Sequence, residues 1–102
     1  MPVLHLKVEA TTEQSFLGVF CHFITPEKHR VKMVGSSNSK LTGEASVIIS
    51  GRLVGVIKVV AAKGVEYKLK ITRKDNEKLL FEAPGTVGES LISRRNVNVD
   101  PS

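Results

Sequence analysis

Apolar and polar residues alternate along much of this chain with a period of two. Over Val3–Ala10, Leu4, Leu6, Val8 and Ala10 fall on one face, and the opposite face is mostly polar. Val65–Thr72 alternates in the same way, with its single tyrosine on the apolar face. Because successive side chains of a β-strand point to opposite faces of its sheet, both runs are predicted to be half-buried strands.

The most apolar stretch is Ala45–Ala62, in which eight of eighteen residues are valine or isoleucine. These β-branched side chains pack well on a pleated sheet. Gly51-Arg52 suits a two-residue hairpin turn, because glycine reaches positive φ without steric cost. The pattern predicts paired antiparallel strands at Ser46–Ser50 and Leu53–Val60, in the centre of a sheet covered on both faces.

A second apolar stretch, Phe16–Ile24, contains three of the four phenylalanines. With a period of two, Phe16, Phe20 and His22 share one face, and both faces are largely apolar. This pattern predicts a central strand beside the strand Val3–Ala10.

The segment at residues 26–34 fits two structures. Thr25 followed by Pro26 is typical of the start of a short helix, which Gly35 would end. The same residues also fit a turn followed by a strand His29–Val34. The apolar positions favour the strand, because they follow a period of two better than one of 3.6.

Polar and glycine-containing segments separate the remaining strands. Small polar residues predict a mobile loop near 35–40. Lys78–Ala83 is predicted to form a hairpin with Val65–Thr72, and Pro84-Gly85 a turn. Two weaker strands, Thr86–Ser93 and Asn96–Asp100, are predicted on either side of a basic turn at residues 94–96, before a frayed C-terminus.

Together these patterns predict a single all-β domain spanning residues 1–102. Seven or eight short strands joined by short turns are typical of an antiparallel β-sandwich, with a small β-barrel as the alternative. Cys21 is the only cysteine, so the chain has no internal disulfide, which suits a reducing compartment and predicts a cytoplasmic location. The run Ala45–Ala62 is too short for a membrane span and is interrupted by Arg52 and Lys58.

No set of residues in the sequence indicates catalysis. Cys21 and His22 are adjacent, so in one strand they point to opposite faces and cannot act as nucleophile and base. We expect Cys21 to be a buried thiol and His22 to be a hydrogen-bonded histidine of the core. His5, His22, His29 and Cys21 lack the close-spaced pairs of a zinc site, so neither a metal nor another cofactor is expected. The protein is predicted not to be an enzyme, and no small-molecule substrate is inferred.

Basic residues offer one lead to a partner, because the formal net charge is +5. Lys68, Lys70, Arg73 and Lys74 are the candidate contacts for phosphates of a nucleic acid. Two further basic clusters lie at residues 28–32 and 94–95. Single-strand binders usually expose aromatic residues for base stacking, however, and here Tyr67 falls on an inward face and the phenylalanines lie in apolar runs.

The leading functional hypothesis is a non-enzymatic protein-interaction or assembly module. Many strands without catalytic chemistry favour self-association or binding of a protein partner through an exposed strand edge. Val3 and Leu80, both apolar on outward faces, are consistent with such an interface. The alternative is a basic nucleic-acid-binding β domain that contacts phosphates.

Overall fold

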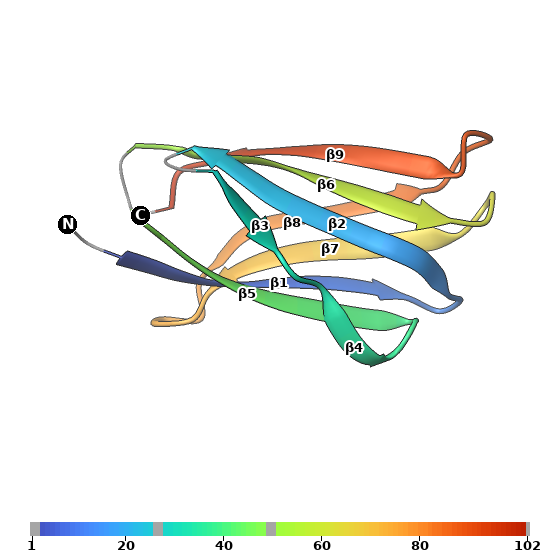
Figure 1. Ribbon diagram of the computed structural model, residues 1–102, viewed down its shortest axis with the longest axis horizontal. Helices are drawn as coiled ribbons and strands as arrows, with labels where there is room; N and C mark the ends of the chain where they lie inside the picture. The colour runs from blue at the N-terminus through green and yellow to red at the C-terminus, as the bar shows by residue number, and fades with distance from the viewer. Residues whose placement is uncertain (1–2, 26–27, 49–50, 102) are drawn as a thin grey trace.

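The computed structural model describes residues 3–25, 28–48 and 51–101, which contain nine strands and no helix. Two antiparallel sheets pack face to face (Figure 1). Sheet A has the strand order β4-β5-β1-β7-β8, and sheet B the order β3-β2-β6-β9. The strands are β1 Val3–Thr12, β2 Phe16–Thr25, β3 His29–Val31, β4 Val34–Ser37, β5 Lys40–Ile48, β6 Leu53–Ala61, β7 Glu66–Arg73, β8 Leu79–Thr86 and β9 Ile92–Val99. The predicted antiparallel β-sandwich is therefore confirmed.

The hydrophobic core lies between the two sheets. Sheet A contributes Leu6 and Val8 from β1 and Leu69 from β7, and sheet B contributes Phe23 and Ile57, all with fully buried side chains. Burying a side chain of this size contributes about 1.5–3 kcal/mol to folding. The alternation predicted for Val3–Ala10 and Val65–Thr72 is confirmed, because the apolar face of each segment lies in this core.

The predicted central hairpin is wrong. β5 pairs with β1 and β4 in sheet A, whereas β6 pairs with β2 and β9 in sheet B, so the two segments belong to different sheets. Residues 49–50, the end of the predicted strand Ser46–Ser50, lie outside the described residues, and Gly51 of the predicted turn has a φ of 85°. β1 and β2 are also in different sheets, against the prediction. The period of two shows which face of a strand is apolar but not which strand lies beside it.

The C-terminal half confirms one hairpin and corrects two turns. β7 and β8 pair as predicted, but Pro84-Gly85 lies inside β8 rather than in a turn. A proline is tolerated there because β8 is an edge strand. The predicted basic turn at residues 94–96 is part of β9, which pairs continuously with β6 from Ile92 to Val99. The connection instead falls at residues 87–91, where Leu91 has a φ of 63°.

Residues 28–40 carry the chain from the edge of sheet B to the edge of sheet A (Figure 1). The predicted strand His29–Val34 is confirmed only in part, because His29–Val31 forms β3 whereas Val34 begins β4 in the other sheet. Residues 26–27 lie outside the described residues. The loop predicted near 35–40 is shorter than expected, because it contains most of β4 and the first residue of β5. Gly43 of β5 lies directly beneath this crossing, where an added Cβ would stand 2.7 Å from the Lys32 carbonyl oxygen.

Candidate functional site

The outer face of β2 is apolar and open to solvent. Phe20 is 60% exposed, Ile24 42% and Leu17 76%. An irregularity in the pairing with β6 between Phe16 and Gly18 reverses the side-chain alternation, so Phe16 is buried while Phe20 faces outward. The predictions that these two rings share a face, and that the strand is covered on both sides, are therefore wrong.

Lys58 of β6, Arg94 of β9 and Lys32, just after β3, lie on the same outer face as Phe20 of β2. Phe20 of β2 is paired with Lys58 of β6, and Lys58 is paired with Arg94 of β9. Val31 of β3 is paired with Cys21, so the next residue, Lys32, lies beside Phe20. Phe20, Lys32 and Lys58 line the same groove. Because neighbouring strands lie about 4.8 Å apart, these four side chains form a row across the sheet, which we call the basic row.

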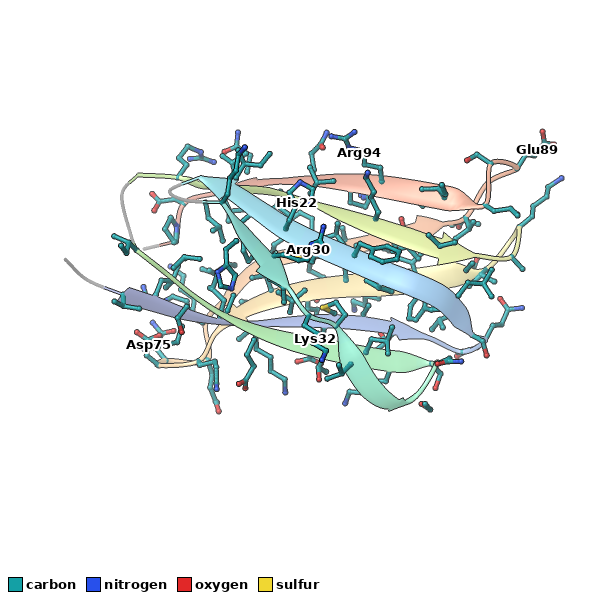
Figure 2. The ribbon with its side chains drawn as sticks, in the orientation of Figure 1. His22, Arg30, Lys32, Asp75, Glu89 and Arg94 are labelled. Atoms are coloured by element: carbon teal, nitrogen blue, oxygen red, sulfur yellow. The ribbon has the colours of Figure 1, made fainter. Side chains whose placement is uncertain are left out.

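A second row lies two residues along the strands. Here His22 of β2 is paired with Arg30 of β3, and both side chains line the groove between these strands. Figure 2 shows His22 on β2, Arg30 on β3 and Arg94 on β9, with Lys32 just beyond the end of β3. Asp75 and Glu89 lie at opposite ends of its long axis in the same view.

Acidic side chains are missing from the strands of this sheet. β2, β3, β6 and β9 contain no aspartate or glutamate, whereas four of the five strands of sheet A contain a glutamate. Within residues 3–25, 28–48 and 51–101, none of Arg30, Lys32, Lys58 and Arg94 forms an ion pair. The outer face of sheet B is therefore a cationic surface whose charges are not neutralised by the described part of the chain.

The candidate patch predicted from the sequence has different surroundings. Lys68 and Lys70 lie together on the outer face of sheet A, with Nζ atoms 3.3 and 3.8 Å from the carboxylate oxygens of Glu82. Glu82 lies on the neighbouring strand β8. An acid between the two lysines reduces the attraction of this surface for an anion.

The other two predicted residues are also paired with acids. Arg73 binds Asp75 with an Nη2–Oδ2 distance of 2.5 Å, and Lys74 Nζ lies 2.7 Å from Glu44 Oε1. These hydrogen bonds lower the pKa of the Asp75 and Glu44 carboxyl groups. Arg73 also donates to the Pro101 carbonyl, 2.9 Å away, so it connects the end of β7 to the C-terminal segment.

Cys21 and His22 point to opposite faces of β2, as expected from their adjacency. Cys21 is buried, and burial raises the pKa of its thiol to about 12. His22 is exposed, so the interpretation as a core histidine is wrong. Over the described ranges, no group of three histidine, cysteine or acidic residues is arranged to hold a metal ion. No helix among these residues is long and apolar enough to cross a bilayer.

Sequence reasoning missed Phe20 and Lys58 as parts of one surface. The basic clusters at residues 28–32 and 94–95 were recognised, but their assembly around β2 and β6 depends on strand order. The sequence did contain one indication of a surface poor in acids: between Glu13 and Glu66, the only acidic residues are Glu27 and Glu44. Comparison with protein-family models, with curated proteins and with solved structures found no match for this chain.

Proposed function

We propose that this protein is a non-enzymatic binding module that holds an anionic macromolecule on the outer face of sheet B. The observation that carries the proposal is the pairing of Lys58 with Arg94 on an acid-free sheet. Like charges directly opposite each other on neighbouring strands destabilise a sheet. An anion bound across both side chains would relieve this repulsion, and a surface that is only solvated gains nothing from placing the cations in register.

The electrostatic contrast between the two sheets supports the same function. Lys7, Lys68, Lys70, Arg73 and Lys74, on or beside sheet A, have acidic partners at 2.5–3.8 Å, and the cations of the basic row have none among the described residues. Uncompensated positive potential attracts polyanions and speeds their association. The groove between β2 and β3 adds depth to this surface, because Phe20, His22 and Arg30 line it from both strands.

Two double variants test the position of the binding surface. Lys58→Gln with Arg94→Gln removes two charges from sheet B, and Lys68→Gln with Lys70→Gln removes two from sheet A. Each takes the formal net charge from +5 to +3, since 5 − 2 = 3. The measurement is the salt concentration at which each protein elutes from immobilised heparin, used as a model polyanion.

The sheet B variant is expected to elute at clearly lower salt than the wild-type protein, and the sheet A variant close to it, because Lys68 and Lys70 are already balanced by Glu82. Equal shifts for the two variants would show that only net charge matters and would refute the proposed surface. Circular dichroism of both variants verifies that the sandwich is intact.

Assembly through a strand edge is a second candidate, and β9 is the edge that favours it. Edge strands β3 and β4 have three and four residues and β8 contains Pro84, whereas β9 has eight residues without proline. The Ala61 N–H donates to the Leu91 carbonyl at 3.2 Å. Hydrogen-bonding pairs alternate in an antiparallel ladder, so the backbone groups of Arg94 and Asn96 point away from β6.

Another feature of β9 opposes edge pairing. Arg95 lies on the inward row of this strand, opposite buried Ile57, and an inward-pointing charge on an edge strand discourages addition of another strand. The cationic face is therefore the better supported binding surface, and the mass of the protein in solution tests the edge.

A further inference from the structure

We propose that the anionic partner of the sheet B surface is a single-stranded nucleic acid, with Phe20 as the base-stacking residue and Lys32, Lys58 and Arg94 as phosphate contacts. This inference rests on the proposed function and narrows it to one partner. It also moves the nucleic-acid site away from Lys68, Lys70, Arg73 and Lys74, which lie on or beside sheet A.

The position of Phe20 carries the argument. Its ring is 60% exposed on an inner strand of sheet B, with Lys58 directly opposite and Lys32 lining the same groove. Folding does not need this ring for the core, because the inward face of β2 is filled by Val19, Cys21 and Phe23. Single-strand binders combine exposed aromatic residues with a positively charged groove, so that bases stack while cations follow the backbone.

The interleaving of the side chains separates this partner from other anions. Duplex DNA would satisfy the cations, but its stacked bases cannot reach Phe20. A membrane-bound surface segregates its apolar and basic residues into an inserted face and a headgroup-facing rim. In the basic row, Phe20 lies between Lys32 and Lys58 on a sheet whose neighbouring strands are about 4.8 Å apart. This spacing favours alternating contacts with phosphates and bases.

His22 extends the same arrangement into the next row. It lies two residues from Phe20 on β2, on the same exposed face, and is paired with Arg30. Imidazole rings and guanidinium planes both serve as stacking partners for unpaired bases. The surface therefore offers a second stacking position beside the first, along the direction of the strand.

The absence of tryptophan makes a direct test possible. Phe20→Trp places a single tryptophan in the basic row, and Leu79→Trp places one at a position 49% exposed on β8 of sheet A. The ligand is an oligothymidylate of about 12 nucleotides, within the range of about 4–16 nucleotides that single-strand-binding folds cover. Stacking on a base is expected to quench the fluorescence of Phe20→Trp, whereas Leu79→Trp is expected to stay unquenched.

Binding of the labelled oligonucleotide, followed by fluorescence anisotropy, separates stacking from charge. Phe20→Ala is expected to weaken binding about 5- to 160-fold without changing its salt dependence. Lys58→Gln with Arg94→Gln is expected to flatten the slope of log affinity against log salt by about 1.4, because two phosphate contacts are lost. Phe20→Tyr keeps an aromatic ring and is expected to bind like the wild-type protein.

The outcomes distinguish this inference from the proposed function on which it rests. Equal binding of a duplex of the same length, or of Phe20→Ala and wild type, would overturn the single-strand assignment and leave the anionic surface standing. Tighter binding of polyglutamate or of phosphatidylserine vesicles would assign the surface to an acidic polypeptide or a membrane instead. If neither heparin nor the oligonucleotide binds, both proposals fail.

Discussion

Cys21 and His22 show how strongly the surroundings of a residue depend on its place in a strand. The two are neighbours in the sequence, but the thiol is 2% exposed in the core and the imidazole is open to solvent. Adjacency in the sequence predicted their separation correctly, because strand residues alternate between faces. Which of the two would be buried was not decided by the sequence, since both faces of β2 are apolar.

The buried thiol of Cys21 is predicted to be unreactive in the native protein. Burial raises its pKa from 9.0 to about 12, so little thiolate exists at pH 8. Iodoacetamide is expected to modify Cys21 only after unfolding in urea, with mass spectrometry as the readout. Rapid alkylation of the folded protein would contradict the burial.

The raised pKa of Cys21 also makes the stability of the protein depend on pH. Between pH 9.0 and about 12, the native thiol keeps its proton whereas the unfolded thiol releases it. The free energy of unfolding therefore falls as the pH rises above about 9.

At the scale of elements, the pairing of β6 with β9 brings together two cations of the proposed binding surface. Lys58 and Arg94 lie directly opposite each other on these strands, and such a like-charge pair lowers the stability of the sheet. Natural proteins often retain such unfavourable local features where they bind a partner. The consequence can be tested by changing a single charge.

Lys58→Glu is predicted to stabilise the protein while weakening polyanion binding. An opposite-charge pair with Arg94 would replace a like-charge pair, a gain of about 0.2–1 kcal/mol in the free energy of unfolding. Urea unfolding at low salt measures this difference. Lys70→Glu is the matched control, and it is expected to destabilise because it places a like charge beside Glu82. A loss of stability in Lys58→Glu would contradict the repulsion inferred here.

The elements themselves were more predictable than their partners. The alternation over Val3–Ala10 and Val65–Thr72 identified β1 and β7, with the correct inward residues. The irregularity between Phe16 and Gly18 could not be predicted, because it arises from the pairing of β2 with β6. That irregularity turns Phe20 outward. The sequence pattern had instead predicted Phe20 as part of an apolar strand covered on both faces.

At the scale of the whole molecule, the two sheets differ in charge. In sheet A, Glu9 of β1, Glu44 of β5 and Glu82 of β8 form ion pairs with lysines, whereas the strands of sheet B contain no acid. One face of the sandwich therefore carries lysine–glutamate ion pairs, and the other carries the cations of the proposed anion-binding surface. The net charge of +5 gave no indication of this division.

The wild-type protein is expected to be a monomer of 11.1 kDa when light scattering is measured on a sizing column. The binding surface proposed for sheet B is complete within one chain, and Arg95 opposes pairing along β9. A particle of twice this mass would instead support assembly through that edge. In that case Asn96→Pro, which removes an edge-facing N–H, would restore the monomer.

The sequence by itself determined the secondary structure class and the inward residues of the regular strands. These follow from the local period of two and from β-branched composition, which act within a few residues along the chain. Only the tertiary structure decided that β5 and β6 separate into two sheets, and that β3, β2, β6 and β9 are neighbours. Strand order is a property of the whole chain, because it depends on which distant segments bury their apolar faces together. The candidate site consists of residues from these four strands, so it exists only at that scale.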